Sequence, residues 1–133
     1  MNLTRAQLDA IVHALAVVLP ARAPADTQLR QVFRDNPNLG GRDRALVADT
    51  VYAVLRRRRL LEHVTPHASP REMALATLVK LQGIGLTQIE TVLDRGEREW
   101  LAELRALDLD TLPFEIRADL PDWVIERLRR TMD

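Results

Sequence analysis

The sequence predicts an all-α protein, a single-domain bundle of six or seven helices within 133 residues. Nearly every segment with periodic apolar residues has the period of a helix, and no alternating pattern is long enough for a useful strand. Capping residues and prolines mark where several of these segments begin. Apolar residues make up 47% of the chain and charged residues 29%, which is typical of a folded globular protein.

The first two segments are expected to be amphipathic helices. In residues 4–19 the apolar side chains fall on one side of a helical wheel: Leu8, Ile11, Leu15, Val18 and Leu19. Pro20 and Pro24 bracket a short loop. Asp26 is expected to cap the second helix, because its carboxylate can accept hydrogen bonds from free N–H groups, and this helix ends near Asn36-Pro37.

The third segment, residues 42–63, is expected to be one long helix. Val51 lies at the centre of its buried stripe, with Val47, Val54 and Leu55 to either side. Arg44 and Arg58 fall close to the same line. We expect a structural role for both, in which the hydrocarbon stem covers apolar surface and the guanidinium meets a carboxylate or a helix-end carbonyl.

The remaining arginines of the run, Arg56, Arg57 and Arg59, are expected to face solvent. Two interpretations are open. Cations near a helix C-terminus are stabilised by the helix dipole, by about 0.3–1 kcal/mol each. That effect does not account for three exposed positive charges kept together, whereas contact with RNA phosphates does. These three residues are therefore the candidate RNA-binding site.

Further helices are expected in the second half of the chain. Ser69-Pro70-Arg71-Glu72 and Thr87-Gln88-Ile89-Glu90 both have the residues of a capping box. Gly83-Ile84-Gly85 is expected to end the helix between them. Segments 97–107 and 121–131 complete the set, and the acidic and basic residues of the former are expected to form a solvated face with local ion pairs.

Several kinds of chemistry are not indicated by the sequence. There is no cysteine, and His63 and His67 lack an acidic or cysteine partner for a metal, so neither a metal site nor a thiol nucleophile is expected. No arrangement of nucleophile, base and oxyanion donors is found, and we expect no catalysis by this chain. Aromatic residues are only 4%, too few for a base-stacking platform. No stretch is apolar enough to span a membrane, and a cytoplasmic protein is expected.

The charge is neutral overall but unevenly distributed. Residues 1–71 contain 11 arginines and 6 acidic residues, a balance of +5, whereas residues 72–133 contain 8 basic and 13 acidic residues, a balance of −5. Such a chain can present a local positive potential to nucleic acid. Alternatively, the two halves neutralise each other where they pack.

Three stretches in order resemble a known domain: LGGRDRALVADTVYAVLRRRRLLE (39–62), MALATLVKLQGIGLTQIE (73–90) and RADLPDWVIERLRR (117–130). They resemble the NusB-like domain that begins RsmB-type (Sun family) rRNA cytosine-C5 methyltransferases. The first matches its glycine–arginine–aspartate opening and a tyrosine-containing helix, the second its next helix, glycine turn and following helix, and the third its leucine-proline-x-tryptophan exit. Tyr52 and Trp123 are accordingly expected to be structural.

The resemblance implies an RNA-associated helical domain that helps position rRNA. In that family it is followed in the same polypeptide by a catalytic domain that uses S-adenosylmethionine and a pair of cysteines, neither of which this chain provides. We therefore expect the chain to be the N-terminal domain of such an enzyme or a free-standing relative, with rRNA and the catalytic domain as partners. Two alternatives are a protein-interaction module that docks on the catalytic domain and a NusB-like factor in transcription antitermination.

Overall fold

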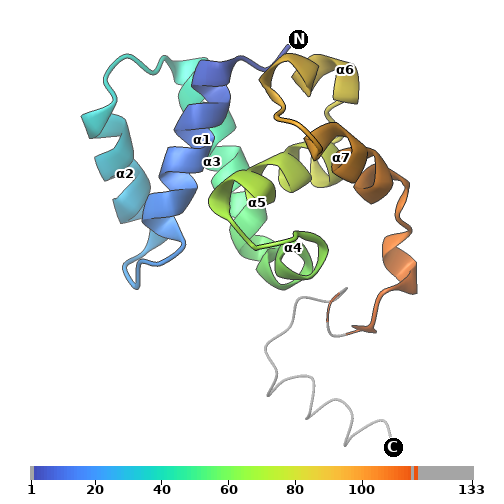
Figure 1. Ribbon diagram of the computed structural model, residues 1–133. Helices are drawn as coiled ribbons and strands as arrows, with labels where there is room; N and C mark the ends of the chain where they lie inside the picture. Colours follow the sequence, from blue (N-terminus) through green and yellow to red (C-terminus); the bar gives the residue numbers. More distant parts are fainter. Residues whose placement is uncertain (1, 115, 117–133) are drawn as a thin grey trace, which may run out of the picture.

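A computed structural model of the chain describes residues 2–114 and 116, and these residues form an all-helical bundle (Figure 1). Seven α-helices occur in this part: α1 (Arg5–Val18), α2 (Ala25–Asp35), α3 (Gly41–Arg56), α4 (Arg58–Val64), α5 (Pro70–Ala76), α6 (Leu86–Ile89) and α7 (Glu97–Ala106). A π-helical turn, η1 (Thr77–Leu81), continues α5, and two 3₁₀ turns follow, η2 (Glu90–Val92) and η3 (Leu109–Thr111). The described residues contain no strand, so the predicted all-α class is confirmed.

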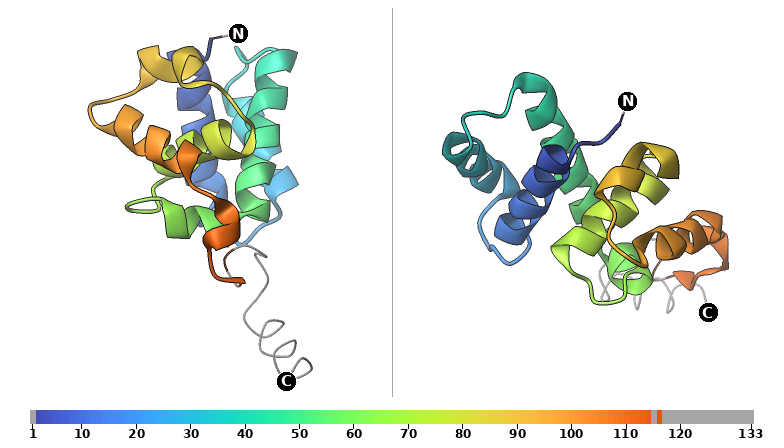
Figure 2. Two further views of the ribbon diagram at one scale, coloured as in Figure 1. Left: turned by 90° about the vertical axis from the view of Figure 1, so that its right-hand side faces the viewer. Right: turned by 45° about the horizontal axis from the view of Figure 1, so that its top comes forward.

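The core forms around α1, which packs against α2, α3 and α5. The predicted apolar face of α1 is buried, with Leu8, Ile11 and Leu15 fully enclosed. Across from it lies the predicted stripe of α3, in which Val51 and Val54 are also fully buried. Burial of each such side chain contributes about 1.5–3 kcal/mol. As Figures 1 and 2 show, α2 and α7 lie on opposite sides of this central group.

The long third helix is interrupted, so the prediction of one helix over 42–63 is wrong. Arg57 leaves the helical conformation, with φ −120° and ψ 29°, between α3 and α4. On an uninterrupted helix Leu60 would lie opposite the buried stripe, because nine residues advance a helix by about half a turn beyond whole turns. The break redirects the chain, and both Leu60 and Leu61 are buried. Burial of these two leucines is the physical reason for the break.

Of three helix caps predicted from the sequence, the structure confirms one and contradicts two. Ser69 caps α5 as predicted: its hydroxyl accepts from the Glu72 N–H at 3.1 Å, and the Glu72 carboxylate accepts from the Ser69 N–H at 3.1 Å. The capping box predicted at Thr87 is wrong, because α6 begins at Leu86 and the Gln88 side chain accepts from the Gly85 N–H. Asp26 does not cap α2, whose N-cap is Pro24.

One arginine–glutamate pair attaches α7 to α5. Arg71 donates from Nε and Nη2 to the two carboxylate oxygens of Glu97, both at 2.9 Å, and Nη2 also donates to the Val92 carbonyl at 2.8 Å. The Glu97 side chain is only 17% exposed. The expectation of a uniformly solvated face on this helix is therefore wrong at Glu97, which pairs across the fold and not with a neighbour on its own helix.

None of the described helices is of a length and apolar character that would let it cross a bilayer.

Candidate nucleic-acid interface

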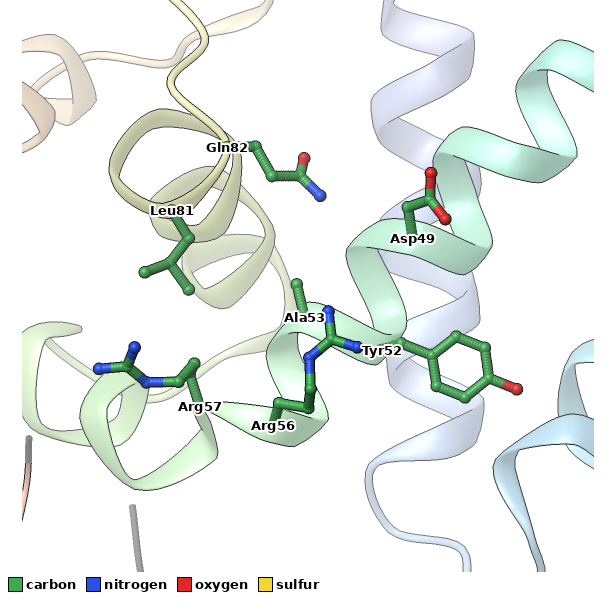
Figure 3. A pocket seen from close by; sticks show the side chains of 7 residues that line it. All are labelled: Asp49, Tyr52, Ala53, Arg56, Arg57, Leu81 and Gln82. Carbon is green, nitrogen blue, oxygen red and sulfur yellow. The ribbon is translucent and has the colours of Figure 1, made fainter. Parts of the chain in front are cut away.

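A hollow of about 490 Å³ lies where α3 meets α4, beside the end of η1 (Figure 3). Its lining residues come from α3, from the junction and from the end of η1: Asp49, Tyr52, Ala53, Arg56, Arg57, Leu81 and Gln82. The π-helical turn brings Gln82 to α3, where its side-chain oxygen lies 3.5 Å from the Thr50 hydroxyl. The break after α3 therefore places part of the arginine run at the edge of an open polar depression.

The three predicted RNA-binding arginines differ in their surroundings. Arg56 is exposed, as expected, and makes no hydrogen bond or ion pair with the described residues. Arg57 and Arg59 are half-buried and already engaged within the chain. Figure 3 shows the guanidinium groups of Arg56 and Arg57 directed away from each other. The run is therefore not one flat patch, and Arg56 is the exposed one of these three residues.

Arg58 connects two helices at the surface. Its Nε donates to the Glu62 carboxylate at 3.1 Å and its Nη1 donates to the Leu19 carbonyl, at the C-terminus of α1, at 3.3 Å. The sequence placed Arg58 on the buried line of a continuous helix, but the break leaves it exposed at the start of α4. The contacts to a carboxylate and a helix-end carbonyl are nevertheless of the structural kind expected for it.

Tyr52 connects α3 to the start of α2. Its hydroxyl donates to Asp26 Oδ1 at 2.6 Å, and Asp26 lies in the first turn of α2, one residue after the helix begins. This hydrogen bond raises the pKa of Tyr52, as do burial and the negative charge of Asp26, while the positive charge of Arg30 opposes the rise. The phenol therefore stays protonated and donating at neutral pH. Tyr52 lines the hollow of Figure 3 and also lies within electrostatic reach of Arg30 on α2.

Arg44 lies over the ring of Phe33, with its guanidinium carbon 5.8 Å from the ring centroid. This cation–π contact joins α3 to the end of α2. A second hollow, of about 290 Å³, is lined by Arg30, Phe33, Arg34 and Arg44. Three of its four lining residues are cationic and none is acidic, whereas Asp49 offsets part of the charge at the first hollow.

Sequence reasoning did not single out Arg30 and Arg34. The available signal was their spacing of four residues on an amphipathic helix, where such residues are surface neighbours. Leu29 and Val32 are the buried residues of α2, so its two arginines remain exposed. Their proximity to Arg44 could not be read from the sequence, because it depends on how α2 and α3 pack.

Trp123 and the 117–130 motif lie outside the described residues. No group of three or more histidine and acidic side chains that could hold a metal ion occurs in residues 2–114 and 116. No protein-family model, curated protein or solved structure matches this chain.

Proposed function

We propose that this chain is a helical RNA-binding domain that performs no catalysis itself and helps position ribosomal RNA for a cytosine-C5 methyltransferase domain. The observation that carries the proposal is the set of exposed arginines on α2 and α3 with no carboxylate partner in the described part of the chain: Arg30, Arg34, Arg42, Arg44 and Arg56. Exposed cations that the fold does not use are free to contact phosphates. The rRNA and methyltransferase assignment rests on the sequence resemblance.

The chemistry of this interface is electrostatic positioning. Each arginine that contacts a phosphate releases condensed counterions and adds affinity that does not depend on sequence. A small set of such contacts supports binding in the micromolar range or weaker, which suits a domain that orients RNA for a partner. S-adenosylmethionine and the reacting base would be bound by the catalytic domain, and this chain would hold the RNA backbone beside it.

The test is a titration of an rRNA fragment across a salt series. We expect Arg56→Ala to bind more weakly than wild type and with a shallower dependence on salt, because one phosphate contact is removed. The matched control is Arg22→Ala, which removes the same charge from an exposed position elsewhere. Equal weakening in both variants would leave only a nonspecific effect of net charge. Equal binding by wild type and the first variant would refute the contact at the junction.

A second function, docking on a catalytic domain, is favoured by a different surface. An open hollow of about 330 Å³ between α4, α7 and η3 is lined largely by apolar side chains: His63, Val64, Trp100, Glu103, Leu104, Leu107 and Leu112. Mixing the chain with a separately prepared RsmB-type catalytic domain tests this function. Complex formation without RNA, lost in Leu112→Asp, would support docking, while RNA binding without complex formation would favour the first function.

A further inference from the structure

We propose that the hollow between α2 and α3 is a phosphate-binding site, in which Arg30, Arg34 and Arg44 hold one phosphate group and Phe33 holds Arg44 in position. The ligand class is a phosphate group. Its identification as a phosphodiester of RNA rests on the proposed function. The other molecule that could provide the phosphate group is a free phosphate. The site is separate from the arginine run at the α3–α4 junction.

The site is formed by two helices that run in opposite directions. The start of α2 is joined to the later part of α3 by the bond between Asp26 and Tyr52. The end of α2 is joined to the start of α3 by the contact between Phe33 and Arg44. Arg30 lies between these two contacts along α2, Arg34 follows Phe33 one turn after Arg30, and both line the hollow with Arg44. The arginines therefore occupy fixed positions on helices and not on loops.

Three guanidinium groups around one hollow repel one another, and no carboxylate from the described residues lines it. The only acidic residues of α2 are Asp26 and Asp35. Asp26 accepts from Tyr52, and Asp35 accepts from Gln31 Nε2 at 3.0 Å. Arg30 and Arg34 make no hydrogen bond or ion pair with residues 2–114 or 116. An anion in the hollow would relieve this repulsion.

Phosphate fits this arrangement better than a carboxylate does. A phosphate group offers several acceptor oxygens, and arginine matches them with pairs of parallel N–H donors. Two donors from α2 and a third from α3 can approach one phosphate from two sides. Phe33 holds the Arg44 guanidinium through the face of its ring, which leaves the N–H edge available for hydrogen bonds. This restraint reduces the conformational entropy lost when the ligand binds.

The first experiment uses pyrophosphate as the probe. Arginine Nε–H signals of the chain would be followed by NMR during a titration, with each signal assigned from single variants. We expect saturable shifts at Arg30, Arg34 and Arg44 and smaller, unsaturated shifts at Arg56. In Phe33→Leu, which retains an apolar side chain and the full charge, we expect affinity for pyrophosphate to fall several-fold. Uniform shifts at all exposed arginines, or equal affinity in wild type and Phe33→Leu, would overturn the site.

The second experiment identifies the source of the phosphate. Binding of a single-stranded rRNA fragment of about ten nucleotides would be compared among Arg30→Ala/Arg34→Ala, Arg44→Lys and the control Arg22→Ala/Arg95→Ala. We expect the first variant to bind about tenfold more weakly and its salt slope to fall by about 0.7 for each RNA phosphate that it can no longer neutralise. Arg44→Lys, which retains the charge but not the planar donor group, is expected to weaken binding about threefold.

The outcomes separate this proposal from the proposed function. Saturable pyrophosphate binding with no RNA binding would support the site with a free phosphate as its ligand, and would refute RNA binding by the chain. RNA binding that depends on Arg56 but is the same in Arg30→Ala/Arg34→Ala and its control would preserve the proposed function and overturn the α2–α3 site. Circular dichroism of each variant would verify that the helices remain folded.

Discussion

Arg71 and Arg44 both belong to the positively charged half of the chain, but the fold uses them differently. Arg71 is 26% exposed and makes two hydrogen bonds to Glu97 and one to the Val92 carbonyl. Arg44 is exposed and has the ring of Phe33 as its contact. Arg71 is therefore committed to the attachment of α7 to α5, whereas Arg44 has no carboxylate partner among the described residues. The position of a carboxylate, and not the residue type, separates a structural arginine from one available to a ligand.

The same difference extends to the regions around these two residues. In the α5–α7 region three other cations contact the fold as well: Lys80 donates to the Arg105 carbonyl at 2.9 Å, Arg105 donates to the Ile84 carbonyl at 3.3 Å, and Arg98 pairs with Glu90 at 3.4 Å. Arg95 is the exception, since it is exposed and has no such contact among the described residues. On α2, neither Arg30 nor Arg34 has such a partner among the described residues. Among the described residues, therefore, no acidic residue of the second half pairs with Arg30 or Arg34.

The largest predicted effect on stability comes from the α5–α7 region, where Arg71 is paired with Glu97. Arg71→Met would leave the Glu97 carboxylate largely buried without its guanidinium, and we expect the free energy of unfolding to fall by about 2 kcal/mol. Urea denaturation measures this loss. The double variant Arg71→Met/Glu97→Gln should recover part of it, because no buried charge then lacks a partner. A loss below about 0.5 kcal/mol in Arg71→Met, the usual range for surface substitutions, would show that the pair is not structural.

Acid should act on the same region. Hydrogen bonds from Arg71 lower the pKa of Glu97 and outweigh the opposing effect of burial. Burial also works to raise the pKa of Glu72, but donors from Ser69 and His67 outweigh it and lower that pKa. Folded-state pKa values below the ordinary 4.5 mean that both groups stabilise the fold above pH 4.5.

This stabilisation should therefore decline as the pH falls from 4.5 through the lower pKa values of the folded state. Unfolding measured between about pH 6 and pH 3 checks the decline. Arg71→Met should show a smaller decline than wild type, because the main cause of the low pKa of Glu97 has been removed. An identical pH dependence in the two proteins would assign the acid sensitivity to other groups.

The sequence contained enough information for the helical class and for the core. Periodic apolar residues in α1 and α3 identified Leu8, Ile11 and Val51, all of which are fully buried. The break at Arg57 was not predicted, because helical periodicity within 42–63 gives no sign of it. The break can be inferred only if Leu60 is known to be buried together with the stripe of α3. That requirement depends on the position of other helices, which the sequence does not provide.

The candidate site was less predictable for a related reason. Four adjacent arginines suggested a binding site, but adjacent residues on a helix point in different directions. The cationic hollow instead combines Arg30 and Arg34 with Arg44, which are separated along the sequence by a loop. The structural role expected for Arg44 came from its place on the stripe of α3 alone. The ring of Phe33 beside it comes from α2, and a wheel of one helix contains no information about the next.

A smaller effect is expected from the start of α5, which carries Arg71 in its first turn. Ser69→Ala removes the hydroxyl that accepts from the Glu72 N–H, and we expect a loss of about 1 kcal/mol. If the cap also positions Arg71, the combined effect of Ser69→Ala and Arg71→Met will be smaller than the sum of the two single effects. Strict additivity in urea denaturation would show that the cap and the ion pair act independently. The control is Thr4→Ala, which removes the corresponding cap of α1.

The smallest effect should come from the α2–α3 face, where few contacts bury polar groups. Tyr52→Phe removes an exposed hydrogen bond to Asp26, and we expect a loss of about 0.5 kcal/mol in global stability, the low end for a single hydrogen bond. The local consequence should be clearer, because this bond is one of two ties between α2 and α3. Amide hydrogen exchange in α2 should accelerate while exchange in α5 stays unchanged. Equal acceleration in both helices would mean that α2 unfolds only with the whole protein, and that the two regions share one stability despite their different use of charge.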